Sequence, residues 1–255
     1  MIKFFLFIIL LISSILVVLA LNDVIVQNII VFTFSLLLLT HSVFTLRWML
    51  YAWENPRNAK EHASPKVFQM PYYAFTILIP ARGEENVIEA TIQSMAAVDY
   101  PNHLKEVLVL VREDDKLTHL FAESAISWIK DKNIRVVTFA LNIGLMHAKN
   151  EIVVVFDAED DPHRDILNVA NTILLTENPD VIQSGVQLMN YNSRWFSLLN
   201  VLEYFFWFKS GLLFFSKVGG TTPLGGNTVF FKKKLLKNAG GWREECLTED
   251  AEIGL

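Results

Sequence analysis

Two long apolar runs open the chain, and shorter apolar runs alternate with polar segments after them. Residues 2–21 carry a single charge, Lys3, and a second apolar run covers residues 24–53. A helix of about 20 apolar residues crosses the hydrocarbon core of a bilayer. The pattern therefore predicts a hairpin of two transmembrane helices within residues 1–54, joined by the polar break Asn22–Asp23.

Basic residues flank this predicted hairpin. Lys3 precedes the first run, whereas Arg57, Lys60 and Lys66 follow the second. Because basic residues are retained on the cytoplasmic side of a membrane, we expect both ends of the hairpin, and the domain that follows, in the cytoplasm. The prediction is a multi-pass protein of the plasma membrane. A cleaved signal peptide that ends near Ala20 is the alternative, although the first run is long for one.

The chain after the hairpin has a different pattern. Residues 55–74 are polar and contain several prolines, which is typical of a linker. Strands are expected at 75–80, 106–111, 134–139 and 151–156, and helices at 84–98, 116–130 and 140–148. Strands that are apolar on both sides and alternate with helices predict an α/β domain over residues 75–255. Its sheet should be mostly parallel, with helices on both faces.

Helical periodicity predicts which side of each helix faces the sheet. In helix 84–98 the predicted inward residues are Val87, Ile88, Thr91, Ile92, Met95 and Ala96. In helix 116–130 the predicted inward residues are Leu117, Leu120, Phe121, Ala125, Trp128 and Ile129.

Composition supports a membrane-attached protein and excludes several other classes. Of 255 residues, 52% are hydrophobic, and the mean hydropathy is +0.34, which is high for a soluble domain. A net charge of -5 without a basic tract argues against nucleic acid as a partner and leaves membrane lipid as the expected one. The single cysteine, Cys246, excludes an internal disulfide, and no histidine is spaced with it as in a zinc site.

Acidic clusters follow three of the predicted strands. They comprise Glu84–Glu85, Glu113–Asp115 and residues 157–161. Ligands of such sheets bind beyond the carboxyl ends of the strands, and carboxylates that converge there repel one another unless they share a cation. Mg²⁺ and Mn²⁺ prefer oxygen ligands and are commonly completed by substrate phosphates. The sequence therefore predicts a metal site that binds a diphosphate.

Each cluster also has a purely structural interpretation. Asp161–Pro162 is a good helix start, and we assign Asp161 mainly to an N-cap. The segment Glu113–Asp115 could be a solvated loop. Asp157, in contrast, directly ends a buried strand, where an unpartnered carboxylate is costly, so a function is the better reading.

Three motifs resemble those of family 2 glycosyltransferases. They are Ile79–Glu85, similar to the nucleotide-binding entry, Val155–Pro162, similar to the D-x-D metal motif, and Thr248–Asp250, which stands as T-E-D. Gly225–Asn227 and Gly240–Trp242 precede the third motif at the expected distance. The chain resembles in particular the membrane-embedded branch of cellulose-, chitin- and hyaluronan-synthase-like enzymes. This resemblance implies a GT-A-like domain over residues 75–255.

The resemblance also implies roles for the matching residues. The donor would be a nucleotide sugar, a UDP-sugar in particular, and the acceptor a polysaccharide or a lipid-linked glycan, with inversion at the anomeric carbon. Glu84 and Asp114, or its neighbours Glu113 and Asp115, would bind the base and ribose. Asp157 and Glu159 would hold the nucleotide and Mg²⁺ or Mn²⁺. Gly226 and Glu249 would lie at the sugar, and Asp250 would be the general base. A helix cap is the alternative role for Asp250.

Residues 195–218 form an unusually apolar, aromatic stretch interrupted by Glu203 and Lys209. A transmembrane span there would separate Asp157 and Asp250 to opposite sides of the membrane. We predict instead an interfacial helix with its aromatic side chains at headgroup depth. Burial in the core is the alternative.

Two departures from the family pattern concern activity. A basic loop that contacts the diphosphate is missing between Phe139 and Ala140, and the chain stops at Leu255, before the expected acceptor motif and further membrane helices. We therefore also consider a catalytically inactive homologue or fragment that serves as an assembly subunit. A nucleotidyltransferase is a weaker alternative, since a glycine-rich loop after the first strand is approximated only by Arg82–Gly83.

Overall fold

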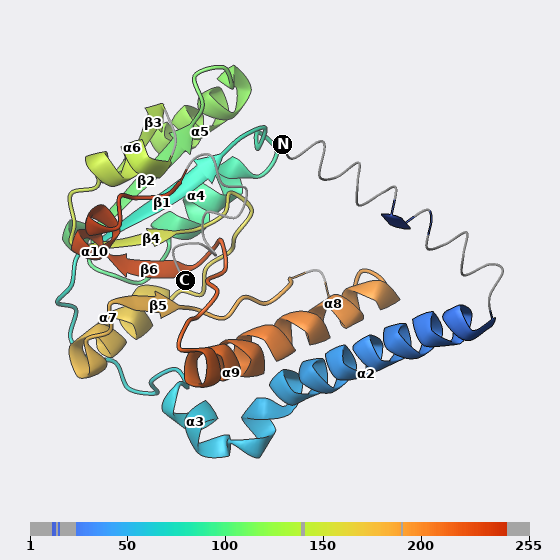
Figure 1. Ribbon diagram of the computed structural model, residues 1–255. Helices are drawn as coiled ribbons and strands as arrows, with labels where there is room; N and C mark the ends of the chain where they lie inside the picture. The colour runs from blue at the N-terminus through green and yellow to red at the C-terminus, as the bar shows by residue number, and fades with distance from the viewer. Residues whose placement is uncertain (1–11, 14, 16–23, 139–140, 190, 244–255) are drawn as a thin grey trace. The chain divides into compact units, whose positions relative to one another are not determined.

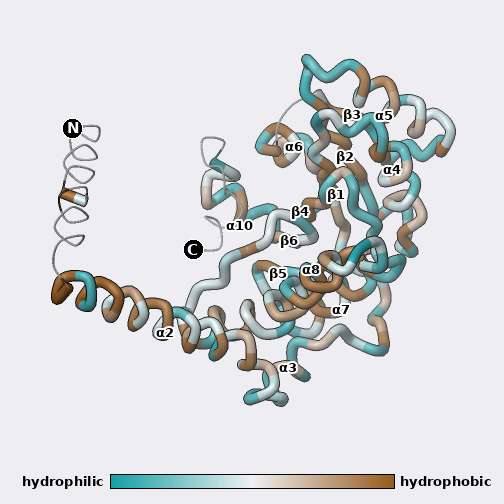
Figure 2. Tube along the Cα trace, turned by 90° about the vertical axis from the view of Figure 1, so that its right-hand side faces the viewer, coloured by the Kyte–Doolittle hydropathy of each residue, from teal (hydrophilic) through white to brown (hydrophobic). Residues whose placement is uncertain are grey.

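The computed structural model describes residues 12–13, 15, 24–138, 141–189 and 191–243. Its contacts divide the chain into two units, residues 1–51 and 52–255. Most of the first predicted span and the break Asn22–Asp23 lie outside the described residues, so the hairpin stays a prediction. The second predicted span is one 31-residue helix, α2 (Val24–Glu54), with no buried residue. Its trace is hydrophobic along much of its length (Figure 2).

The second unit contains the predicted α/β domain. Its strands are β1 (Phe75–Ala81), β2 (Lys105–Val111), β3 (Ile134–Thr138), β4 (Ile152–Val155), β5 (Val181–Gln183) and β6 (Val229–Lys232). Its helices are α3 (Pro56–Glu61), α4 (Ile88–Ala96), α5 (Lys116–Ile129), α6 (Leu141–His147), α7 (Ile166–Glu177), α8 (Trp195–Phe206), α9 (Leu212–Phe214) and α10 (Lys233–Asn238). A 3₁₀ turn, η1 (Asn102–Leu104), and two π-helical turns, η2 (Trp207–Gly211) and η3 (Phe215–Gly219), complete them.

The strands form one sheet of order β3-β2-β1-β4-β6-β5 (Figure 1). Parallel pairing joins β1 to β2, β2 to β3 and β1 to β4, whereas β6 runs antiparallel to both of its neighbours. The mostly parallel sheet that the sequence predicts is confirmed. The apolar pattern did not predict β5 or β6, and β6 inserts between β4 and β5.

Alternate residues of the strands point to opposite faces of the sheet and pack in two separate apolar layers. On one face Ile77, Ile79 and their counterparts pack with α4, α5 and α7. On the other face Leu78 and its counterparts pack with α6 and α10, and Trp242 lies in the same cluster. Since successive side chains of a strand point to opposite faces, an all-apolar strand requires a cover on both sides, as observed.

The inward side of α4 is as predicted, but that of α5 is wrong. Thr118, Ala122 and Ala125 are the buried residues of α5, and of these only Ala125 was expected. Leu117 is 57% exposed and Trp128 is 78% exposed. Ile126 and the predicted Ile129 pack against the core while partly exposed. The small buried side chains let the helix approach the sheet closely, and Leu117 and Trp128 remain on its outer side.

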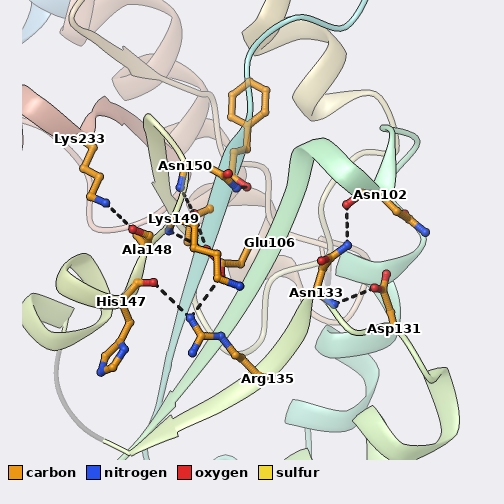
Figure 3. Close-up of polar contacts among 12 residues, drawn as sticks. Asn102, Glu106, Asp131, Asn133, Arg135, His147, Ala148, Lys149, Asn150 and Lys233 are labelled. Atoms are coloured by element: carbon orange, nitrogen blue, oxygen red, sulfur yellow. Dashed lines mark hydrogen bonds and ion pairs between the residues drawn. The ribbon is translucent and has the colours of Figure 1, made fainter.

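A buried carboxylate joins the amino ends of the central strands (Figure 3). Glu106 in β2 accepts hydrogen bonds from the Thr76 hydroxyl (2.8 Å) and the Lys149 backbone N–H (2.9 Å). Arg135 of β3 forms an ion pair with it at 3.2 Å, and the Lys149 ammonium lies at 3.4 Å. This network lies at the amino ends of the strands, whereas the predicted site lies at their carboxyl ends.

The apolar stretch that begins at Trp195 is helical through Gly219. Ser210, Gly211 and Leu212 in its middle are buried, whereas its first half is not. Trp195 is 76% exposed and Leu202 is 51% exposed, and α8 has no buried residue. Within the second unit, the Trp53 ring lies 5.6 Å from that of Phe206. The described residues contain two helices long and apolar enough to cross a membrane, Val24–Glu54 and Trp195–Gly219.

Candidate active site

The carboxyl ends of β1 and β4 lie side by side in the middle of the sheet. Leu78 pairs with Val155, and the Phe156 N–H donates to the Leu78 carbonyl at 3.0 Å. On the other side of β1 the chain continues outward through β2 and β3. The order of the strands therefore reverses between β1 and β4. Open α/β sheets bind ligands at such a switch point.

The turn after β1 is held by a carboxylate from the start of α5. Gly83 has φ of 71°, in the left-handed region that favours glycine. Its N–H donates to Asp115 Oδ2 at 2.6 Å, and the Glu84 N–H donates to the Thr118 hydroxyl at 3.0 Å. Asp115 Oδ1 also accepts from the Thr118 N–H, which makes Asp115 the N-cap of α5.

Both oxygens of Asp115 are thus engaged inside the protein. The hydrogen bond from Gly83, followed by that from Thr118, holds the pKa of Asp115 below its ordinary value. We therefore assign Asp115 to the support of the turn at Gly83 rather than to direct contact with a substrate. Asp115 and Thr118 are spaced as a helix cap, which is the signal in the sequence for this role.

Asp114 lies beside this turn and is exposed. Its carboxylate pairs with Arg112, whose Nε lies 3.1 Å from Oδ1. The hydrogen bond from Arg112 lowers the pKa of Asp114. A shallow groove of about 420 Å³ adjoins the preceding residue, Glu113, and is bounded by α5 and Thr138. Asp157 does not line this groove, so the groove and the ends of β1 and β4 are separate features.

Residues 156–161, here the carboxylate loop, follow β4. Asp157 is partly buried, and its backbone N–H donates to Asp160 Oδ2 at 2.8 Å. The Ala158 carbonyl accepts from the Thr91 hydroxyl of α4, whereas the Glu159 residue is exposed. Burial raises the pKa of Asp160. The internal bonds hold the backbone of the carboxylate loop next to the start of α4.

Residues 225–228, here the glycine loop, lie against the carboxylate loop. The side-chain amide of Asn227 donates to Asp160 Oδ1 at 3.3 Å, and the Thr228 N–H donates to the Val155 carbonyl at 2.7 Å. Gly226, a predicted substrate-binding residue, is exposed in this loop. The structure therefore brings the loop of Gly226 next to that of Asp157.

Protein family models identify the chain at this point. The sequence matches the family described as Glycosyltransferase like family 2 over residues 71–255. The chain belongs to glycosyltransferase-like family 2. The match covers the entire α/β domain and its ordered motifs, and it includes both loops described above.

Curated relatives carry glycosyltransferase names. A beta-monoglucosyldiacylglycerol synthase of Trichormus variabilis is 28% identical over 188 residues, which are 70% of this chain and 40% of the relative. The probable glycosyltransferase YdaM of Bacillus subtilis is 23% identical, over 70% of this chain and 45% of YdaM. The chain thus spans less than half the length of these relatives.

Solved structures of glycosyltransferases share the fold. The mannosyltransferase PcManGT of Pyrobaculum calidifontis, solved with GDP-Man and Mn²⁺, has a TM-score of 0.60 at 24% identity; 85% of this chain and 61% of that chain are covered. TarS of S. aureus, solved with UDP-GlcNAc, has a TM-score of 0.50 at 19% identity, with 71% and 52% covered. The domain of this family 2 chain therefore has the expected GT-A-like architecture.

The acidic residues fit a metal ion only in part. Among the described residues, no three Asp, Glu, His or Cys side chains are grouped as a metal site. Asp157 and Glu159 offer carboxylate oxygens from one loop. This set fits Mg²⁺ or Mn²⁺, since such an ion takes one or two protein carboxylates and completes its shell with phosphate oxygens and water. It does not fit a cage made by the protein alone.

The remaining predictions about site residues are either wrong or fall outside the described residues. Asp161 is not the N-cap of α7, because that helix begins at Ile166 after Asp165. The polar residues between Asp161 and Asp165 have no apolar side to bury, and the buried face of the helix begins at Leu167. Glu249, Asp250 and the junction of Phe139 with Ala140 lie outside the described residues. The residue that sequence reasoning missed is Asp160, which was counted only as a member of an acidic run.

Proposed function

We propose that this protein transfers a sugar from a nucleotide sugar, a UDP-sugar in particular, to a lipid acceptor at a membrane surface. The observation that carries the proposal is Asp157, which follows β4 at the point where the strand order reverses. Membership of the family supports a sugar transfer, and the solved structures with GDP-Man and UDP-GlcNAc support a nucleotide-sugar donor. Inversion at the anomeric carbon is part of the proposal.

The roles of the acidic residues follow from their positions. Asp157 and Glu159 hold Mg²⁺ or Mn²⁺ against the diphosphate of the donor. The ion, when bound, stabilises the charge that develops on the diphosphate as the glycosidic bond breaks. Glu84 and Asp114 face the base and ribose, with Asp115 behind them as the support of the turn. No ion is needed for that support, because Asp115 is bonded within the protein.

The glycine loop and the segment beyond the described residues complete the proposed site. Gly226, exposed and without a side chain, lets the backbone approach the donor sugar. Asp250 removes the proton from the acceptor hydroxyl, and Glu249 binds next to it. A carboxylate in this role supplies about 10²–10⁴-fold of rate.

A lipid acceptor is favoured over a polysaccharide by the exposed apolar side of α8. Trp195, Leu198, Leu202 and Phe205 are exposed along this helix. The helical segment ends at Gly219, only a few residues before the glycine loop, so a helix at headgroup depth would present the glycine loop to lipid headgroups. The name beta-monoglucosyldiacylglycerol synthase of relatives supports a diacylglycerol-type acceptor.

The membrane attachment completes the proposal. The N-terminal hairpin within residues 1–54 anchors the protein in the plasma membrane, residues 55–74 link it to the α/β domain, and that domain works on the cytoplasmic face. Residues 195–218 lie in the interface rather than across the bilayer. The basic residues on either side of the hairpin, Lys3 before it and Arg57 and Lys60 after it, support this orientation.

Titration calorimetry of the full chain in detergent with UDP and Mn²⁺ tests the donor site. We expect saturable, Mn²⁺-dependent binding that Asp157→Asn reduces by at least about tenfold, since a carboxylate ligand is lost. Asp180→Asn is the matched control, because Asp180 is exposed and pairs with Lys232. Absence of binding in the unmodified protein would support the alternative of an inactive assembly subunit. Sugar transfer from UDP-glucose to diacylglycerol vesicles, compared with transfer to oligosaccharides, then tests the acceptor.

A further inference from the structure

A single carboxylate links the two loops of the candidate site. Asp160 Oδ2 accepts from the Asp157 backbone N–H at 2.8 Å, and Asp160 Oδ1 accepts from the Asn227 side-chain amide at 3.3 Å. Asp160 and Asn227 are separated by 67 residues in the sequence. The Asn227 amide also reaches Oδ2, at 3.5 Å. The carboxylate therefore accepts from one donor in the carboxylate loop and one in the glycine loop.

The far side of the glycine loop is fixed as well. Gln183, the last residue of β5, accepts from the Gly225 N–H at 2.8 Å through its side-chain oxygen. Its side-chain amide donates to the Asn227 carbonyl at 3.1 Å. Asn227 is thus bonded through its backbone to β5 and through its side chain to the carboxylate loop.

The direction of these bonds argues that Asp160 is not a second metal ligand beside Asp157. Both of its oxygens face donors of the protein, and the residue is partly buried. Asp157 and Gly226 are the residues proposed to contact the donor. Asp157 is hydrogen-bonded to Asp160, and Gly226 directly precedes Asn227. Loss of the bond between Asp160 and Asn227 would therefore alter the spacing between Asp157 and Gly226.

We propose that Asp160 and Asn227 form a positioning pair that holds the carboxylate loop and the glycine loop at the spacing required by a nucleotide sugar. The pair does not contact the donor. It fixes the backbone of Asp157 on one side and that of Gly226 on the other, so that diphosphate and sugar are bound at one fixed distance. This inference rests on the proposed function.

An isosteric exchange tests the pair. Asp160→Asn keeps one acceptor oxygen, for the Asp157 N–H, and replaces the other by an NH₂ group, so that a donor faces the Asn227 amide where Oδ1 now accepts from it. Asn227→Asp places two carboxylates against each other. The double variant Asp160→Asn with Asn227→Asp restores one donor and one acceptor between the positions, with the polarity reversed and the total charge unchanged.

The test measures two quantities for the full chain in detergent: the UDP affinity in the presence of Mn²⁺, by calorimetry, and the midpoint of thermal unfolding. Each single variant should weaken UDP binding about tenfold, the effect of one buried donor or acceptor left unpaired. The exchanged pair should recover most of that loss. Hydrogen exchange should be faster in the peptides of both loops in each single variant and slow again in the double variant. Asp165→Asn, in the same connection but outside the pair, is the control and should bind UDP as the unmodified protein does.

The outcomes separate the inference from the proposed function. If the unmodified protein binds UDP and the single variants bind it equally well, the positioning pair is overturned and the donor site stands. The same conclusion follows if the exchanged pair regains its unfolding midpoint but not its affinity, since Asp160 would then act on the ligand directly. If the unmodified protein binds no nucleotide, the proposed function fails, and the inference fails with it.

Discussion

The carboxylate of Asp115 accepts a hydrogen bond of 2.6 Å from the backbone N–H of Gly83. This bond joins the start of α5 to the turn after β1, across 32 residues of sequence. The turn precedes Glu84, so the cap of one helix also orients the proposed nucleotide side of the site.

Asp115→Asn should destabilise the protein by about 0.5–2 kcal/mol, the usual worth of a helix N-cap. The effect should depend on pH with a defined sign. Because the pKa of Asp115 is lowered in the folded state, its contribution is present above the ordinary value of 3.8 and is lost as the pH falls through the folded value. Thermal unfolding of the two proteins between neutral pH and pH of about 3 measures this, and the difference should shrink at the acid end. A difference that grows on acidification would contradict the assignment.

Tyr100 should ionise well above the ordinary pKa of a tyrosine. Burial raises its pKa from 10.0 to about 12, and its hydroxyl donates to the Tyr73 carbonyl at 2.8 Å. An acid with a raised pKa stabilises the fold below the unfolded value, so this contribution is lost as the pH rises from 10.0 towards 12. Absorbance titration of tyrosinate should show a late step that Tyr100→Phe removes. Tyr72→Phe, at an exposed position, should leave that step in place.

Glu106→Ala should lower the stability of the fold but leave nucleotide binding at the proposed site unchanged. The substitution leaves the Thr76 hydroxyl and the Lys149 N–H without their acceptor, at a cost of about 1–3 kcal/mol for each buried donor. Its ion pairs add less, since the Lys149 side chain is 71% exposed. Denaturation should report a loss of stability, whereas the UDP affinity of the folded fraction should be unchanged. A change in the UDP affinity at equal folded fraction would show that the amino and carboxyl ends of the strands are coupled.

The exposed side of α8 should affect the acceptor and not the donor. Replacement of both Leu198 and Leu202 by Ser removes apolar area from one side of the helix. If this side contacts lipid, the KM for a lipid acceptor in vesicles should rise about tenfold, since each buried leucine contributes roughly 1.5–3 kcal/mol when fully transferred. The Kd of UDP with Mn²⁺ should stay constant. Glu203→Gln is the control on the same helix, and an equal rise in KM there would argue against a lipid contact.

Much of the fold could be predicted because its strands are short apolar runs bounded by polar residues. The positions of β1, β2 and β4 agree with the prediction to within about a residue, and their parallel arrangement follows from the intervening helices. The acidic groups after β1, β2 and β4 could be anticipated for the same reason. The inward side of α5 could not, because Thr118 and Ala122 carry no apolar signal that exceeds that of Leu117 and Trp128.

The sequence by itself determined the segments of β1 to β4, the apolar helix α2 and the family, since these depend on local residue order and composition. Only the tertiary structure decided that Asn227 meets Asp160 and that Asp115 meets Gly83. Both contacts depend on the order in which strands pair, in particular on β6 beside β4. Strand pairing joins segments far apart in the chain, and a pattern of apolar and polar positions does not specify the partner of a strand.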